Sequence, residues 1–253
     1  MSSNSMQGRA VRVWLGYALA DLAEDREALY LRLGSIFIPA TVQFMGPLGL
    51  QAYVPMVLPR VDNPRIPDEI ALVFYPDAAT YHAACHDSCA GRAYSSLHGT
   101  VFSFAPSQGR PASHSSFPDL FAPGNGQVGP LQVLDDDTNW QHGAVISEVC
   151  SRTDEEAPVF IARCQAAMTG WQQSPPAGLQ GVYVYLDEDF LLCWSRWQGE
   201  ARALTEGLGE SLQCSVAKAV TLPASAFADY AGVPVSAGAS FNPQFMPLAG
   251  GRY

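Results

Sequence analysis

Apolar stretches of strand length alternate with longer segments of helical character along this chain. The spacing of apolar positions in the first half predicts six elements in the order strand, helix, strand, strand, helix, strand. The expected strands are 11–20, 51–58, 69–75 and 100–104, and the expected helices are 25–44 and 77–97. This is the element order of a ferredoxin-like unit.

The second half repeats this order. The expected strands are 143–150, 180–186, 189–197 and 217–222, and the expected helices are 154–171 and 199–214. A shift of 129 positions aligns Pro47-Leu-Gly-Leu-Gln51 with Pro176-Ala-Gly-Leu-Gln180, and eight of the 27 positions from 25 to 51 are then identical. The repeat suggests two tandem copies of one unit.

The predicted fold class is therefore α+β, with two tandem ferredoxin-like βαββαβ halves forming one pseudo-dimeric α/β barrel. Each half would cover one sheet face with its helices and leave the other face apolar, so the two sheets are expected to face each other. The expected organisation is a first half over 11–104, a linker over 105–139, a second half over 140–222 and a C-terminal arm over 223–253.

Composition and charge narrow the classes of partner. The 253 residues include 48% apolar and only 15% charged residues, and the formal net charge is −10. A surface of this charge does not suit a phosphate backbone, so nucleic acid is not expected as a partner. No apolar run approaches the roughly 20 residues of a membrane span. We expect a cytoplasmic protein with reduced cysteines and no membrane partner, either a monomer or a weak homodimer.

The segment Asp189-Phe-Leu-Leu-Cys-Trp-Ser-Arg-Trp197, followed by a predicted helix, resembles the strand and helix of antibiotic-biosynthesis-type monooxygenases. That family belongs to the dimeric α/β-barrel superfamily, and the chain resembles a fused version of such a dimer. The resemblance covers about 30 residues. The superfamily includes cofactor-independent monooxygenases, isomerases, polyketide cyclases, haem enzymes and stress-response proteins, so the resemblance implies a fold and leaves the function open.

Candidate catalytic residues gather on the second predicted helix of the first half. Tyr94 and His98 are four residues apart, so they lie side by side on a helix and can share a proton-transfer site. Arg92 can neutralise a carboxylate or enolate. The equivalent segment 209–216 has no His, Arg or Tyr, which favours the first half as the working site. The alternative is that Tyr94 and His98 only cap the helix.

Aromatic residues in the predicted strands can build an apolar pocket with a few polar tips. The candidate substrate-binding residues are Tyr53, Tyr75, Tyr17, Trp194 and Arg196. The simpler role of each aromatic residue is to fill the core.

No metal site is expected, although His82, Cys85, His86 and Cys89 follow one helical stripe. Four ligands on one helix do not easily close a tetrahedron. No tightly bound cofactor is expected either. Haem is kept as an alternative, with His98, His142 or His82 as the ligand.

The sequence therefore favours an enzyme that oxygenates, cyclises or isomerises an aromatic or polyketide-like substrate by His and Tyr acid–base chemistry. Three alternatives remain open: a lyase that uses Tyr and His for β-elimination, a haem-binding barrel enzyme, and a non-catalytic ligand-binding or stress-response barrel.

Overall fold

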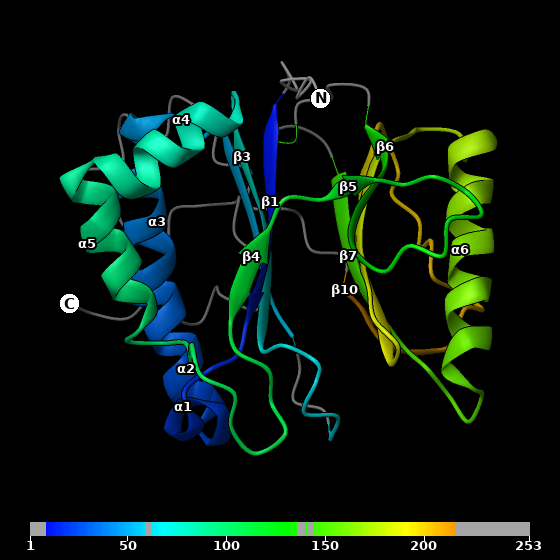
Figure 1. The fold of residues 1–253 in the computed structure, drawn as a ribbon, viewed down its shortest axis with the longest axis horizontal. Coiled ribbons are helices and arrows are strands. Elements are labelled where there is room, and N and C mark those ends of the chain that lie inside the picture. Colours follow the sequence, from blue (N-terminus) through cyan, green and yellow to red (C-terminus); the bar gives the residue numbers. More distant parts are fainter. Residues whose placement is uncertain (1–8, 59–61, 136–139, 141–143, 216–253) are drawn as a thin grey trace, which may run out of the picture.

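A computed structural model of the chain describes residues 9–58, 62–135, 140 and 144–215. Two β-sheets lie face to face, with one group of helices outside the first sheet and one long helix outside the second (Figure 1). Over the described residues, neither sheet closes on itself. The combination of helices with largely antiparallel sheets confirms the α+β class predicted from the sequence.

The first sheet is antiparallel and has the strand order β2-β3-β1-β4. Its strands are β1 (Ala10–Gly16), β2 (Ala52–Val57), β3 (Glu69–Tyr75) and β4 (His114–Ser116). The first three coincide closely with predicted strands, because each is a short run rich in apolar and aromatic residues between turn-forming segments.

Both helices predicted for the first half are present as chains of helical segments. They consist of α1 (Ala20–Glu24), α2 (Arg26–Arg32), α3 (Ile38–Met45), α4 (Ala78–His82) and α5 (Cys89–His98). A wider π-helical turn lies within each helix, over Leu33–Phe37 and Ala83–Asp87. In the second of these, the Ser88 backbone N–H donates to the carbonyl of Ala83, five residues earlier.

The second sheet has the strand order β10-β7-β9-β8-β6-β5. Its strands are β5 (Asp119–Leu120), β6 (Gly129–Asp135), β7 (Ala144–Ser151), β8 (Leu179–Leu186), β9 (Phe190–Trp197) and β10 (Glu210–Ser215), and α6 (Ala157–Gln173) covers its outer face. The strands β8-β9-β7-β10 repeat the order β2-β3-β1-β4 of the first sheet.

The same kind of turn occurs once in each sheet. Gly49 and Gly178, from the repeated Pro-x-Gly-Leu-Gln sequence, both have positive φ, at 105° and 89°. Each precedes the second strand of its unit, β2 or β8. Glycine adopts this backbone conformation without the steric cost of a Cβ atom, which explains why the same residue stands in both turns.

Two predictions from the sequence are wrong, and two others lie outside the described residues. The helix predicted over 199–214 is wrong, because this segment is a loop followed by β10. The strand predicted over 100–104 is also wrong, because only an isolated bridge joins Phe102 to Ala18. The strand predicted over 217–222 and the arm over 223–253 lie outside the described residues.

Residues 105–139, expected as a linker, contain three strands. β4 completes the first sheet, whereas β5 and β6 extend the edge of the second sheet. Only Phe117 and Pro118 separate β4 from β5. β4 and β5 have only three and two residues and lie among Pro and Gly residues, so they show no apolar period and resemble a loop in sequence.

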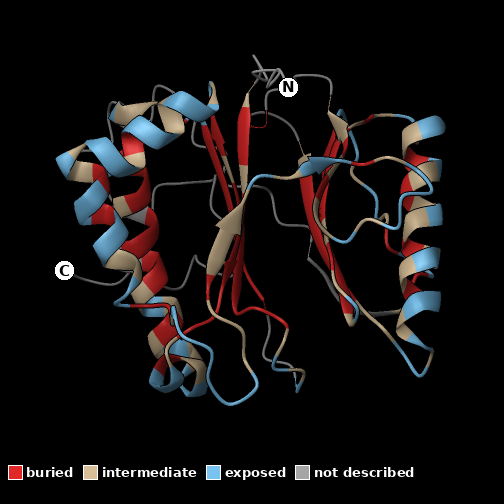
Figure 2. Ribbon diagram, viewed as in Figure 1, coloured by how far each residue is buried: buried red, intermediate tan, exposed pale blue. Residues whose placement is uncertain are grey.

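Three apolar layers hold the molecule together (Figure 2). One fills the space between the first sheet and its helices, and another lies between the second sheet and α6. The third lies between the sheets and includes Leu72, Phe74, Tyr183, Leu192 and Trp194. Alternation along each strand produces this arrangement, because successive side chains point to opposite sheet faces.

Candidate functional site

A cavity of about 230 Å³ lies between the outer face of the first sheet and the helices that cover it. Aromatic side chains line most of it. The lining residues include Trp14, Tyr53, Tyr75, Tyr94 and His98, all contributed by the first half of the chain. The more exposed lining residues are His86, Ser95 and Phe104, which mark where the cavity meets the surface.

The register of the sheet sets the floor of this cavity. Arg12 of β1 and Tyr53 of β2 flank Val73 of β3 in one row across the strands. Further along β1, Trp14 lies opposite Ala71 of β3, and Gly16 lies opposite Glu69 of β3. Residues two apart on a strand share a face, so these rows stack along the same floor.

His98 is a neutral imidazole in an aromatic enclosure. Its ring centroid lies 4.6 Å from that of Tyr94, 4.8 Å from that of Phe37 and 5.2 Å from that of Trp14. Burial lowers the pKa of His98 to about 4. Nδ1 lies 3.1 Å from the backbone carbonyl of Tyr94, and since a carbonyl only accepts, Nδ1 carries the proton. Nε2 is then left as an acceptor.

Tyr94 lies beside His98, as the sequence predicts, but its hydroxyl is engaged elsewhere. The Thr41 hydroxyl donates to the carbonyl of Phe37 at 2.9 Å, so the 2.7 Å contact between Tyr94 and Thr41 has Tyr94 as donor. Burial raises the pKa of Tyr94 well above its ordinary value. Tyr94 therefore remains a protonated phenol that supports the helix packing and the cavity wall.

Glu69 is a fully buried carboxyl group directly behind the cavity wall. The indole Nε1 of Trp14 donates to it at 2.6 Å, and the Tyr53 hydroxyl donates at 3.1 Å. Burial raises the pKa of Glu69 to about 8, and the two hydrogen bonds only partly oppose this shift. The sequence contains a signal for this residue, because Glu69 is in phase with Ala71, Val73 and Tyr75 on the helix-facing side of β3.

Arg12 supplies the positive charge of the cavity. Its Nη2 donates to the carbonyl and hydroxyl of Ser115, at 2.5 and 2.7 Å. The guanidinium lies over the rings of Phe117 and Tyr81, at 4.4 and 5.0 Å from their centroids. Its Nε is buried and has no hydrogen-bond partner among the described residues. Arg12 lines the cavity, so its guanidinium places positive charge at the cavity wall.

The π-helical turns bring further side chains to the same cavity. Phe37 ends the first turn, and Cys85 and His86 belong to the second. A π-helical turn changes the direction of the side chains that follow it, and such turns are frequent at functional sites. Burial raises the pKa of the Cys85 thiol, which is in contact with Tyr75 and Tyr81. Cys85 is therefore a protonated thiol at neutral pH.

Four residues proposed from the sequence lie elsewhere. Arg92 is exposed, and its guanidinium donates to the backbone carbonyls of His86 and Asp87. Trp194 and Tyr17 lie in the layer between the sheets. Arg196 is buried on β9 and donates to Gln180 at 2.9 Å.

The stripe of His and Cys residues on the second helix separates in the structure. His82 and His86 stack with their centroids 5.7 Å apart, Cys85 turns inward, and Cys89 is exposed beside the Arg92 guanidinium at 3.3 Å. Among the described residues, no group of three or more His, Cys, Asp or Glu side chains is arranged to hold a metal ion. His142 lies outside the described residues.

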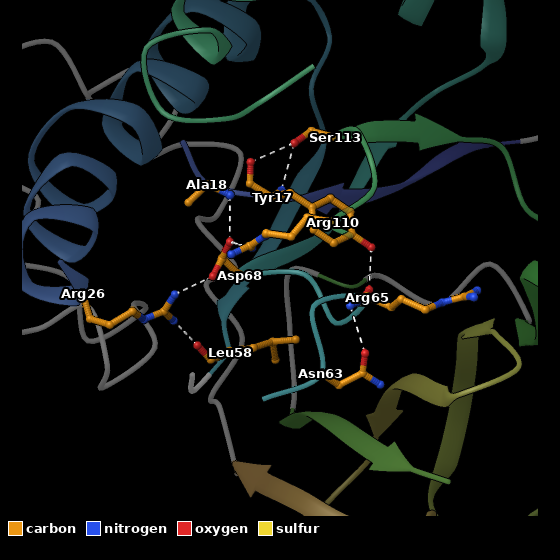
Figure 3. Close-up of polar contacts among 9 residues, drawn as sticks. All are labelled: Tyr17, Ala18, Arg26, Leu58, Asn63, Arg65, Asp68, Arg110 and Ser113. Atoms are coloured by element: carbon orange, nitrogen blue, oxygen red, sulfur yellow. Dashed lines mark hydrogen bonds and ion pairs between the residues drawn. The ribbon is translucent and has the colours of Figure 1, made fainter. Parts of the chain in front are cut away.

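A second cavity, of about 250 Å³, is polar and lies near the loop between β2 and β3. Figure 3 shows its main contacts, in which Asp68 accepts hydrogen bonds from Arg26, Arg110 and the backbone N–H of Ala18. Arg26 also donates to the carbonyl of Leu58. Since the two arginines are already paired with Asp68, this site offers little free charge for a ligand.

The described part of the chain contains no helix long and apolar enough to cross a membrane.

No protein-family model matches the sequence, and no curated protein matches it significantly. A proposed monooxygenase from Fusobacterium nucleatum has 11% identity over 76% of each chain, with a TM-score of 0.35. A second proposed monooxygenase, from Lactobacillus acidophilus, has 10% identity over 75% of this chain and 77% of its own, with a TM-score of 0.33. An anthrone oxidase-like protein has 9% identity over 79% of this chain and 76% of its own, also with a TM-score of 0.33. Likeness of this size carries no functional assignment.

Proposed function

We propose that this protein is a small-molecule enzyme whose site is the aromatic cavity of the first half, and that it oxygenates, cyclises or isomerises a flat aromatic or polyketide-like substrate. The observation that carries the proposal is the convergence of Arg12, His98 and several tyrosines on one largely apolar cavity. Apolar walls with a few polar groups are typical of sites for small organic ligands.

In this proposal, different residues of the cavity make different contacts with the ligand. The rings of Trp14, Phe37 and Tyr94 provide flat apolar surfaces against which an aromatic ligand can stack. Arg12 pairs with a carboxylate or enolate of the ligand, the role that the sequence assigned to Arg92. His98 accepts a hydrogen bond from a ligand hydroxyl through Nε2, because its low pKa keeps the ring neutral at physiological pH.

The proposal includes no tightly bound organic cofactor. Trp14, Phe37 and Tyr94 already pack around the imidazole of His98, with centroids within 5.2 Å. These rings fill the space that a haem plane would need beside a His98 ligand. The visible spectrum of the purified protein tests this directly, since a Soret band would contradict the proposal.

We further propose that the two sheets arose from tandem duplication and together correspond to a fused barrel dimer. The repeated strand order and the repeated turn at Gly49 and Gly178 support the duplication. The apolar layer between the sheets supports the second part, because each sheet covers the face that the other would expose.

Ligand binding tests the cavity. We expect 2-naphthoate, a flat aromatic anion, to bind and to quench intrinsic fluorescence. Arg12→Gln should weaken this binding by about tenfold or more, since a charge-assisted contact is lost. Arg92→Gln is the matched control and should leave it unchanged, because Arg92 lies outside the cavity. No binding by the wild type, or equal losses in both variants, would overturn the proposal.

A measurement of turnover distinguishes an enzyme from a protein that only binds the ligand. Oxygen consumption and product mass should be followed with phenolic polycyclic compounds that bind the cavity. In a working enzyme, His98→Ala should lower turnover by about 10²–10⁴-fold while the protein remains folded. Binding without any turnover across such compounds would favour the non-catalytic ligand-binding barrel.

A further inference from the structure

The carboxyl group of Glu69 has an environment that packing alone does not explain. It is fully buried, and among the described residues its side chain accepts hydrogen bonds from two neutral donors, Trp14 and Tyr53. Both donors line the aromatic cavity, whereas Glu69 lies behind them. A buried carboxyl group without a cation is costly, so its position beside two cavity residues calls for a functional reason.

We propose that Tyr53 and Glu69 form the proton acceptor of the cavity, in which the Tyr53 hydroxyl takes a proton from a bound substrate and passes its own proton to the Glu69 carboxylate. The proposal rests on the proposed function of the same cavity. It names the base for a substrate that carries an acidic O–H or C–H group.

The transfer is balanced without a further reactant. The substrate X–H bond breaks and its proton forms a new O–H bond with the Tyr53 oxygen. At the same time the original Tyr53 proton moves along the 3.1 Å hydrogen bond to Glu69. The net change is one carboxylate converted to a carboxylic acid and one substrate converted to its anion, which Arg12 can then pair with.

The groups around Glu69 favour this assignment. Tyr53 faces it from β2, Trp14 faces it from β1, and Tyr94 approaches from α5, while His98 packs on Trp14. The pKa of each tyrosine is raised, and His98 is neutral with a pKa of about 4. Glu69, with a pKa of about 8, is therefore the group in this set whose proton affinity suits a base near neutral pH.

Small residues make the contact geometrically possible. Ala71 lies between the rows of Tyr53 and Glu69 on β3 and leaves room for longer side chains to lean across it. Gly16 lies opposite Glu69, and a Cβ atom there would come within 2.9 Å of the Trp14 Nε1 atom and 2.6 Å of the Phe102 ring. The glycine thus allows the indole N–H to reach the carboxyl group.

The probe for this pair is 3-nitrophenol, an acidic phenol whose ionised form absorbs in the visible and whose pKa lies near that of Glu69. Binding is followed by absorption, and proton release is counted in weakly buffered solution and corrected for the ionised fraction of the free probe. Above pH 8, where Glu69 is ionised, the wild type should bind phenolate with nearly no net proton release. Below that pH Glu69 already holds a proton, so it should no longer retain the proton of the probe.

Two variants remove the acceptor in different ways. Glu69→Gln and Tyr53→Phe should each release about one proton per bound phenolate, or bind the neutral phenol. Tyr75→Phe is the matched control, because it removes another cavity hydroxyl, one that contacts Cys85, and proton retention should persist. If Glu69→Gln fails to fold, Tyr53→Phe still decides the question.

The outcomes distinguish the two proposals. Binding with equal proton release in the wild type and in Glu69→Gln or Tyr53→Phe overturns the proton acceptor but leaves the cavity as the site. Failure of 3-nitrophenol to bind the wild type overturns the proposed function, and the proton acceptor with it.

Discussion

Glu69 and Glu148 are both fully buried glutamates on strands, yet their surroundings differ. Glu148 accepts hydrogen bonds from the backbone N–H groups of Leu204 and Thr205 and from the Thr205 hydroxyl. These contacts hold the loop that replaces the second helix of the second half. Glu69 instead receives its hydrogen bonds from two side chains that line a cavity. A buried glutamate thus secures a loop in one half and accepts hydrogen bonds from two cavity-lining side chains in the other.

The raised pKa of Glu69 predicts that stability falls as pH rises. A carboxyl group with a folded pKa of about 8 and an ordinary value of 4.5 holds its proton in the folded state but not in the unfolded state between these pH values. Its stabilising contribution is full below pH 4.5 and is lost as the pH rises to about 8. The slope can reach about 1.4 kcal/mol per pH unit.

Urea unfolding at a series of pH values measures this slope. His98 acts in the opposite direction, because its lowered pKa adds stability that is lost as pH falls from 6.5 to about 4. The window from 6.5 to 8 therefore isolates Glu69. Glu69→Gln should flatten the decline in this window, and identical slopes in both proteins would contradict the assigned pKa.

The sequence located part of the candidate site and missed the rest for physical reasons. Tyr53, Tyr75, Tyr94 and His98 were identifiable because strand and helix periods place them toward a common layer. Arg92 lies close in sequence to Tyr94 and His98, but helical positions two and six residues apart point in different directions. Arg12 reaches the cavity through pairing of distant strands, and this register is not visible in a single strand.

At the level of elements, a network centred on Asp68 ties three segments together. Asp68 follows the loop between β2 and β3, Arg26 belongs to α2, and Arg110 closes a tight turn with Ser107. The backbone of Asp68 is itself fixed at the sheet, because its N–H donates to Gly16 and its carbonyl accepts from Leu58. The carboxylate therefore anchors α2 and the turn at Arg110 to the edge of the first sheet.

Asp68→Asn should destabilise the protein by about 2 kcal/mol or more, because two partly buried guanidinium groups lose their counter-charge. Urea unfolding would show the lower midpoint. Asp119→Asn, on the exposed strand β5, is the matched control and should stay within about 0.5 kcal/mol of the wild type. Equal midpoints for the two variants would show that the network adds little.

Long elements were predictable and short ones were not. The predicted strand 69–75 coincides with β3, and the 17-residue α6 overlaps most of the predicted helix 154–171. β4 and β5 have three and two residues, too few to show a period. The repeat predicts a helix over 199–214 in the second half, but a loop over 198–209 and then β10 are found there. The sequence repeat does not extend there, and the backbone of this loop instead satisfies Glu148.

At the scale of the whole molecule, an apolar layer joins the two sheets within one chain. Trp194, Leu192 and Phe190 from β9 pack in the same layer as Val13 and Leu72 from the first sheet. The ion pair between Arg65 and Asp187, at 2.7 Å, adds a contact between the halves. Each sheet thus covers the apolar face of the other within one chain.

Sedimentation should accordingly detect a folded monomer. We expect the monomer to retain its circular dichroism spectrum on dilution, because no apolar sheet face is uncovered when a dimer dissociates. An obligate dimer that loses its secondary structure on dissociation would contradict this prediction.

The passage of the chain from one sheet to the other occupies only Phe117 and Pro118, between β4 and β5. A cut at this point would leave every strand of the first sheet on one fragment and every described strand of the second sheet on the other. The protein is therefore a candidate for a split design, in which two coexpressed fragments reassemble through the layer that joins the sheets. Copurification of residues 1–117 with residues 118–253, each insoluble alone, would show that the covalent link is dispensable once both sheets exist.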